Sequence, residues 1–335
     1  MANVNMRDVA SRAGVSIATV SHVINNTRFV KEETRQKVLD SIKALGYSPN
    51  ALARSFKTGR KNLIAFIVPD IANPYFAALV DEIESAIAPK GYNLMLCNTR
   101  ESAEKEANYL HTLANGIVDG FIIGTAYTSY QPIAEILPQD TPVIFVDRTL
   151  QDCPCDMLTI DTYTALRTGI EYLIRQGHTR IANITVAGCK LSTAYERRAA
   201  YDDAMAAHGL STEGLIFTGN QLTRFCPSKP MELHTNIQSR ILQPDITAVI
   251  SPNAILTSEI LSMLDGTNRR PGKDIEILGF RETEQPQYIN PNIHLICSPA
   301  EALGHAAGEQ ILERIEHPEL PVRRTILSAS FVPHK

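Results

Sequence analysis

The chain has 335 residues, of which 44% are hydrophobic, 20% charged and 6% aromatic, with no Trp. This ordinary globular composition excludes a disordered or collagen-like chain, and the length predicts about two domains. The N-terminus carries no apolar secretory segment, and the longest apolar runs fall far short of the ~20 residues of a membrane span. We therefore expect a soluble, cytoplasmic protein with no membrane partner.

The net charge of −4 is the sum of two opposed parts. Residues 1–61 hold 11 basic and 4 acidic residues and carry +7, whereas the remainder carries −11. A small basic head on an acidic body is typical of a polyanion-binding module joined to a second domain.

The head is predicted to contain three helices. Residues 6–13 follow the N-cap residue Asn5, and Gly14 then permits a left-handed turn. Ser16 is placed to cap a second helix over 17–24, and a third helix is predicted over 32–45, where Val38, Leu39 and Ile42 are apolar. Helix, three-residue turn and helix is the helix-turn-helix layout, whose second helix enters the major groove of DNA.

Any small three-helix unit shares this pattern, but the positive charge and the small polar outer face of the second helix favour DNA binding. We expect Ile17 and Ala18 to contact thymine methyl groups and the polar side chains to bond bases or phosphates. The predicted DNA-contacting residues of this helix are Ser16, Ile17, Ala18, Thr19, Ser21, His22 and Asn25.

The string DVASRAGVSIATVSHVIN strongly resembles the signature of the LacI/GalR (lactose repressor) family of bacterial transcription regulators. TVSHVINNTRFVKEETR is especially similar to the purine-repressor branch, and the resemblance continues through the whole chain. It implies a homodimeric repressor of a palindromic double-stranded DNA operator. It also implies a two-lobed body, like that of periplasmic binding proteins, with a small-molecule effector in the interlobe cleft.

Residues 48–61 are predicted to be a linker. Ser48 and Pro49 can start a helix of about two turns, which is too short to be stable alone in water. The resemblance implies that two such hinge helices enter the minor groove, where an apolar side chain wedges a base step. That position is usually Leu in the family and is Phe56 here; the alternative is that Phe56 packs on the body. The hinge contacts that the resemblance implies are Asn50, Ala51, Arg54, Ser55 and Phe56.

Beyond the linker, short apolar runs alternate with amphipathic stretches, which predicts parallel sheets covered on both faces by helices. The predicted strands are 63–68, 92–97, 120–124, 143–147, 180–186, 215–217, 247–250 and 276–280, and the predicted helices include 76–90, 102–116, 163–177, 195–208 and 254–264. The strands are too many for one ordinary sheet, so two similar halves are expected.

The predicted fold is therefore an all-α helix-turn-helix head on an α/β two-lobed body. Its domains are the head at 1–47, the hinge at 48–61 and the effector-binding and dimerisation domain at 62–335. The resemblance implies three crossings between the lobes, near residues 160, 291 and 322. The end of the chain, SFVPHK, shows no leucine heptads, which favours a dimer over a tetramer.

Ligand groups are expected at the carboxyl ends of the strands. The resemblance places an effector against the loop after the first strand and against two arginines. The residues it implies are Asn73, Tyr75, Phe76, Arg148, Asp161 and Arg197, with Gln221 at a loosely aligned position.

Two departures from the family pattern suggest a different ligand. Asn253 is followed by Ala254 where the family has Asp, and Arg281 stands where the family has the Asp that holds sugar hydroxyls or purine. If Arg148, Arg197 and Arg281 share one pocket, they need anionic partners. We therefore expect an anionic effector, such as a sugar acid, a sugar phosphate or an organic acid. The alternative is that Arg281 faces solvent or pairs with a nearby glutamate.

Other functions find little support in the sequence. No nucleotide-binding, esterase or metalloprotease motif occurs, so no catalytic residue and no cofactor are predicted. His178 is expected to cap or pack. Cys153 and Cys155 could bind a metal, but two close thiols without other ligands are weak evidence for a site, so no metal is predicted. A solute-binding receptor or an enzyme on the same body fold remains the alternative, although neither explains the basic head.

Overall fold

The computed structural model describes residues 4–25, 28–47, 60–186, 190–219, 238–281 and 292–334. The chain divides into two compact units, 1–61 and 62–335. Most of the predicted hinge, residues 48–59, lies outside the described residues. None of the described helices is long and apolar enough to cross a membrane.

The first unit is the three-helix head, with α1 (Met6–Ala13), α2 (Ile17–Asn25) and α3 (Glu32–Leu45). The Asn5 side chain accepts a hydrogen bond from the Arg7 amide, and the Asn5 amide donates to the Asp8 carboxylate at 2.8 Å. This reciprocal cap fixes the start of α1. Gly14 ends α1 at a φ of 65°, in the left-handed region that favours glycine.

The head has a small apolar core formed by Val9, Ala10, Val20, Val23 and Val38. Leu39, predicted as an apolar position of the third helix, is 43% exposed and does not belong to this core. Val38 and Ile42 lie four residues apart and so share the inward face, which turns Leu39 about 100° away from it.

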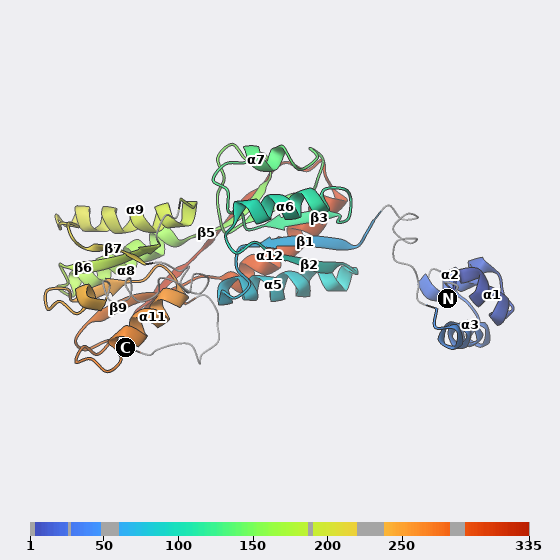
Figure 1. Ribbon diagram of the computed structural model, residues 1–335, viewed down its shortest axis with the longest axis horizontal. Coiled ribbons are helices and arrows are strands. Elements are labelled where there is room, and N and C mark those ends of the chain that lie inside the picture. The colour runs from blue at the N-terminus through green and yellow to red at the C-terminus, as the bar shows by residue number, and fades with distance from the viewer. Residues whose placement is uncertain are drawn as a thin grey trace. The chain divides into compact units, whose positions relative to one another are not determined.

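The second unit contains two six-stranded sheets (Figure 1). The first has the order β11-β5-β4-β3-β1-β2 and is parallel throughout. The second has the order β12-β10-β9-β8-β6-β7, with β12 as an antiparallel edge strand. The strands are β1 (Leu63–Val68), β2 (Asn93–Asn98), β3 (Gly120–Ile123), β4 (Val143–Val146), β5 (Asp156–Asp161), β6 (Ile181–Val186), β7 (Ile216–Gly219), β8 (Ala248–Ile250), β9 (Glu276–Arg281), β10 (His294–Cys297), β11 (Arg324–Ser328) and β12 (Ser330–Val332).

Helices cover both sheets, as buried parallel strands require. Those of the N-terminal lobe are α5 (Pro74–Ile87), the short 3-10 helix η1 (Ala88–Lys90), α6 (Ala103–Leu113), α7 (Gln131–Ala134) and α12 (Ala300–Glu316). Those of the C-terminal lobe are α8 (Thr162–Arg175), α9 (Ser192–Ala207) and α11 (Ala254–Leu264). The body is thus the predicted α/β two-lobed fold.

The chain changes lobe three times. It passes from β5 into α8 at Asp161–Thr162, from β10 into α12 through Ser298 and Pro299, and from β11 into β12 at Ala329. The second and third crossings come later in the chain than the predicted positions near 291 and 322. The reason is that β10 belongs to the second sheet and that β11 extends to Ser328.

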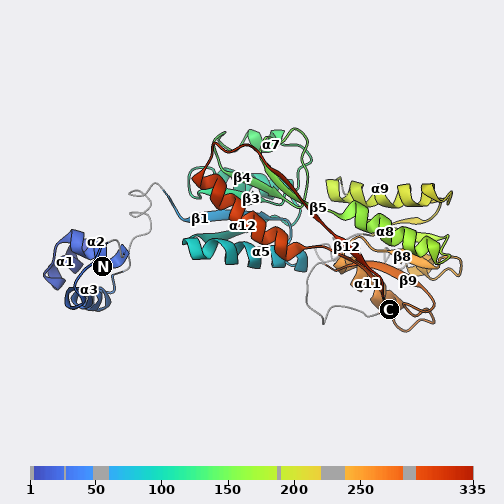
Figure 2. The same ribbon diagram turned by 180° about the vertical axis from the view of Figure 1, so that it is seen from behind.

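Helix α12 is distant in sequence from the rest of the N-terminal lobe but packs along α5 (Figure 2). The two helices approach closely at Gly304 and Gly308. A Cβ atom at Gly308 would lie 2.6 Å from the Ala86 Cβ, and one at Gly304 would lie 2.9 Å from the Leu79 carbonyl oxygen. The absence of these two side chains therefore lets α12 close one face of the first sheet.

Candidate functional site

The first candidate site is the amino-terminal face of α2. The Ser16 hydroxyl accepts a hydrogen bond from the Thr19 amide at 3.1 Å and lies 2.9 Å from the Thr19 hydroxyl, so it caps the helix as predicted. Ser16, Ile17 and Ala18 are exposed, and Ile17 keeps 44% of its surface accessible. An exposed branched apolar side chain beside a helix N-terminus offers both apolar and hydrogen-bonding contacts to a groove.

The remaining predicted DNA contacts divide into two groups. Thr19, Ser21 and His22 are half-buried on α2, and Asn25 is its last residue. The hinge residues lie outside the described part of the chain and stay predictions; they are Asn50, Ala51, Arg54, Ser55 and Phe56.

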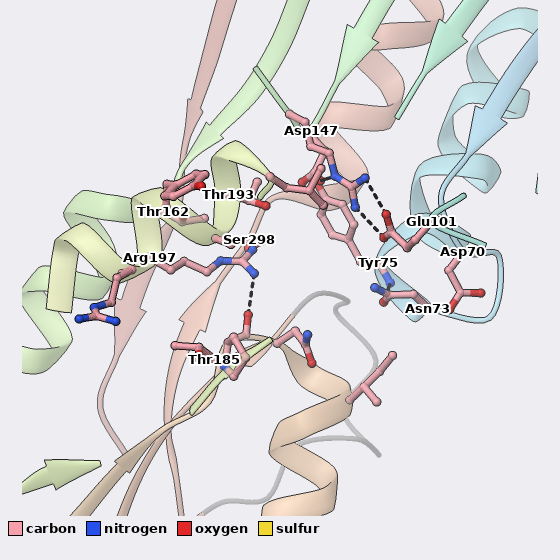
Figure 3. A pocket seen from close by; sticks show the side chains of 18 of the residues that line it. Asp70, Asn73, Tyr75, Glu101, Asp147, Thr162, Thr185, Thr193, Arg197 and Ser298 are labelled. Carbon is pink, nitrogen blue, oxygen red and sulfur yellow. Dashed lines mark hydrogen bonds and ion pairs between the residues drawn. The ribbon is translucent and has the colours of Figure 1, made fainter. Parts of the chain in front are cut away.

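The second candidate site is a cavity of about 660 Å³ in the body, lined by residues of both lobes (Figure 3). Asp147 follows β4, Thr162 follows β5 and Ser298 follows β10, so the cavity lies at the carboxyl ends of strands from both sheets. This is where open parallel sheets bind ligands, and the volume is ordinary for a small-molecule site.

The loop after β1 supplies one wall. The Asn73 side chain accepts a hydrogen bond from the Tyr75 amide at 3.1 Å and so caps α5. Tyr75 and Phe76 pack edge to face, with ring centroids 5.1 Å apart, and both are buried. All three residues line the cavity, and the capped helix start holds the two rings in place.

Arg148 lies in the cavity wall and is almost fully paired. Its guanidinium donates two hydrogen bonds to the Glu101 carboxylate, at 2.6 and 2.8 Å, and a third to the Thr125 carbonyl oxygen at 2.6 Å. Asp147 lies 3.5 Å from its Nε atom. The arginine side chain is only 6% exposed, so this charge is already balanced within the protein.

Arg197 has a different environment. It extends from α9 over the ring of Phe280, 4.6 Å from the centroid, and one terminal nitrogen donates to the Pro252 carbonyl oxygen at 2.7 Å. Its Nε atom is buried and has no hydrogen-bond partner among the described residues, and the same is true of the Thr162 hydroxyl. Both residues line the cavity, so they offer polar groups that a ligand can satisfy.

The other predicted effector residues are not all at the cavity. Asn253 lines it and caps α11 through the Leu256 amide, at 2.9 Å. Asp161 is not among the described lining residues, because its carboxylate caps α8 through the Thr164 amide and hydroxyl. Gln221 lies outside the described residues.

Arg281 also lies off the described lining. It pairs with Cys297 in the register of β9 with β10, and its side chain hydrogen-bonds the Cys297 thiol. The expectation that three arginines converge on one pocket therefore does not describe the structure, since Arg281 points toward the neighbouring strand.

Two carboxyl groups near the cavity have raised pKa values. Burial raises the pKa of Glu106, and hydrogen bonds from the Ala126 amide and the Thr125 hydroxyl oppose this shift. Burial also raises the pKa of Glu196, which lies beside Arg197. Glu106 supports the Thr125 segment that holds Arg148, so it stabilises the wall from behind.

Sequence reasoning missed Glu101 and the lining residues Thr162 and Ser298. Each follows the carboxyl end of a strand, which is the signal that could have found them. His178, which was expected to cap or pack, hydrogen-bonds the Thr247 hydroxyl at 2.9 Å and is not among the described lining residues.

Fold and site together define a two-lobed ligand-binding body fused to a helix-turn-helix head. The family profile for periplasmic binding proteins and the sugar-binding domain of the LacI family matches residues 61–335. The profile for bacterial regulatory proteins of the lacI family matches residues 5–50. The chain belongs to the LacI family of bacterial transcriptional regulators.

Full-length relatives support this assignment. The chain is 32% identical to the HTH-type transcriptional repressor PurR of Vibrio campbellii, over 96% of this chain and 98% of the relative. It is 32% identical to the ribose operon repressor of Escherichia coli K12, over 96% of each chain. The fold matches that of the lac repressor dimer bound to operator and the anti-inducer ONPF, with a TM-score of 0.82, 22% identity and coverage of 99% and 98%. The chain is thus a transcriptional repressor of this family and not an enzyme.

Proposed function

We propose that the chain represses transcription by binding a palindromic double-stranded DNA operator as a homodimer, and that a small-molecule effector in the interlobe cavity controls this binding. The observation that carries the DNA-binding part is the capped, exposed N-terminal face of α2 on a head with a charge of +7. Such a surface can bind phosphates and base edges. The function of a solute receptor or an enzyme does not require a basic helix-turn-helix surface.

The effector acts through the two lobes. The cavity is lined from both lobes, and three crossings join them, so a ligand that contacts both walls favours one relative pose of the lobes. If the operator-binding form of the dimer needs one of these poses, effector and DNA become reciprocally coupled through a population shift.

The wall favours an effector with one acidic group. Arg148 is balanced by Glu101 and Arg281 lies off the lining, which leaves Arg197 as the one of the three arginines able to take an anion. In the described part of the chain, Arg197 has no carboxylate at ion-pair distance. Thr162, Asn183 and Asn253 offer hydrogen bonds to hydroxyl groups beside it. A sugar acid or a hydroxylated organic acid fits this set better than a dianionic sugar phosphate.

A neutral sugar is the competing class, because one relative is a ribose operon repressor. A thermal-shift panel with matched pairs, such as gluconate and glucose or ribonate and ribose, separates the two classes. We expect the acid of a pair to raise the melting temperature more than its neutral partner. A larger shift with the neutral sugars would reject the acidic effector while leaving the repressor assignment intact.

The Arg197→Gln variant tests the same residue directly. It removes the charge that would bind the acidic group, so we expect it to weaken the best acidic ligand by about 10- to 100-fold. Arg167→Gln is the matched control, since Arg167 pairs with Glu171 on α8 and is not among the described lining residues. If both variants bind the ligand with equal affinity, Arg197 does not contribute to ligand binding.

A further inference from the structure

A cluster of two histidines and one glutamate lies at the end of the second sheet opposite the cavity. Glu276 is the first residue of β9 and His294 the first of β10, whereas the cavity lies at the carboxyl ends of these strands. Because β12 runs antiparallel to β10, with Val332 opposite Leu295, the segment after β12 returns to this end and places His334 there. The sheet topology alone therefore brings the three residues together.

The contacts within the cluster are close. Glu276 Oε2 lies 3.1 Å from His294 Nε2 and 3.0 Å from His334 Nε2, and the two imidazole centroids are 4.3 Å apart. One ligand atom from each residue lies within 4.8 Å of the other two. Ligand atoms around a tetrahedral zinc ion, with bonds of roughly 2.0–2.1 Å, are roughly 3.3 Å apart, so small shifts would admit the ion.

The surroundings resemble those of a built site. His294 is 3% exposed, and the rings of Tyr172 and Phe331 lie against it with centroids 5.2 and 6.0 Å away. Side chains of Glu276 and His334 are 20% and 17% exposed, so the cluster is buried on one side and accessible on the other. The three ligands have apolar side chains behind them and are open to solvent in front. This arrangement suits a metal ion that has one coordination position open to an exchangeable ligand.

We propose that Glu276, His294 and His334 bind a divalent metal ion such as Zn²⁺, with a water molecule as the fourth ligand. Two imidazoles and a carboxylate suit zinc, nickel and copper rather than magnesium or calcium. Binding requires a change of tautomer in His294, whose Nδ1 accepts a hydrogen bond from the His334 amide at 3.2 Å. When Nε2 binds the metal, the ring proton moves to Nδ1 and this bond breaks.

The site would fasten the end of the chain to the C-terminal lobe. Glu276 and His294 belong to neighbouring parallel strands, and His334 lies beyond β12, the strand that follows the third crossing between lobes. A metal bound by all three residues ties the edge strand to the sheet interior. This role is independent of operator binding and of the effector cavity.

The test uses the full, untagged chain. We expect isothermal titration with Zn²⁺ to show one site in the wild type. His334→Ala and Glu276→Gln should each lower the affinity of this site by about 100-fold. Titration with Co²⁺ identifies the ligands, because a nitrogen and oxygen site lacks the intense thiolate charge-transfer band that the cysteines would give. His317→Ala is the control, since His317 is exposed and pairs only loosely with Glu319, at 3.4 Å.

Folding of each variant is checked by circular dichroism, and His334→Gln replaces His334→Ala if the latter unfolds. The proposal is supported if the wild type and His317→Ala bind the ion alike and the two cluster variants do not. It is overturned if the wild type binds no Zn²⁺, if the cluster variants bind as the wild type does, or if the Co²⁺ spectrum shows thiolate ligands alone.

Discussion

Arg148 and Glu101 are joined by two charge-assisted hydrogen bonds, of 2.6 and 2.8 Å, in the wall of the interlobe cavity. They follow different strands, β4 and β2, and lie 47 positions apart in sequence. The pair holds the cavity wall together and withdraws one arginine from ligand binding.

Glu101→Gln should therefore destabilise the body. The amide removes the counter-ion and leaves a buried guanidinium poorly paired, which costs about 1–3 kcal/mol of unfolding free energy in urea titrations. Adding Arg148→Met should restore part of the loss, because the unpaired charge is then gone. Strictly additive losses in the double variant would show that the two residues do not act as a pair. Glu104→Gln, exposed in the first turn of α6, is the control.

Ser16→Ala should weaken helix α2. The variant loses the hydroxyl that caps α2 through the Thr19 amide, which costs about 1 kcal/mol of head stability and lowers DNA affinity. Ser11→Ala, at an exposed position on α1, should change neither. Thermal denaturation measures the stability of the head, and fluorescence anisotropy with duplex DNA measures its DNA affinity. Equal stability and equal DNA affinity of the two variants would argue against the cap.

Glu106 should make stability depend on pH in a defined direction. Its folded-state pKa is raised above the reference value of 4.5, mainly by burial, so the folded state holds the proton more tightly than the unfolded state does. Stability contributed by the protonated form is then present below pH 4.5 and is lost as the pH rises through the folded-state pKa.

Unfolding curves of the wild type and of Glu106→Gln, recorded across this pH range, give the difference between their free energies of unfolding. We expect the wild type to lose stability relative to the variant as the pH rises, and the difference to level off above the folded-state pKa. A difference that changes in the opposite direction would show that the hydrogen bonds from Thr125 and Ala126 outweigh burial.

Gly308→Ala tests the close approach of α12 to α5. Alanine has the better helix propensity by about 1 kcal/mol, but its Cβ would lie 2.6 Å from the Ala86 Cβ. We expect the steric clash to outweigh the gain in helix propensity and to lower the free energy of unfolding by about 1–3 kcal/mol, measured by chemical denaturation. Adding Ala86→Gly should recover part of this cost, whereas Glu309→Ala, on the exposed side of α12, should stay within about 0.5 kcal/mol. A stabilised Gly308→Ala would contradict the packing.

Much of this architecture was predictable from sequence. The strong apolar runs and caps gave the three head helices and most central strands, because these segments are long or doubly buried. Strand β5 was missed because it begins and ends with Asp, and β11 because Ile326 is 66% exposed on an edge. Local patterns do not show that such segments pair in a sheet.

The cavity was less predictable than the fold. Resemblance located Arg148 and Arg197, but the Glu101 partner of Arg148 depends on the order of four strands, which no local pattern contains. Arg281 was expected at the cavity because it ends β9. The pleat and register of β9 instead direct its side chain to Cys297. Both outcomes follow from tertiary pairing rather than from residue type.

In the proposed function, the basic head binds DNA and a ligand in the cavity controls this binding. The most direct measurement is fluorescence anisotropy with a palindromic duplex selected from a random pool, for the full chain and for residues 62–335, with and without the ligand identified by thermal shift. We expect only the full chain to bind the duplex. Its affinity should fall steeply as salt rises, and the ligand should change this affinity in the wild type and not in Arg197→Gln. Equal DNA affinity after removal of residues 1–61, or an affinity nearly independent of salt, would contradict it.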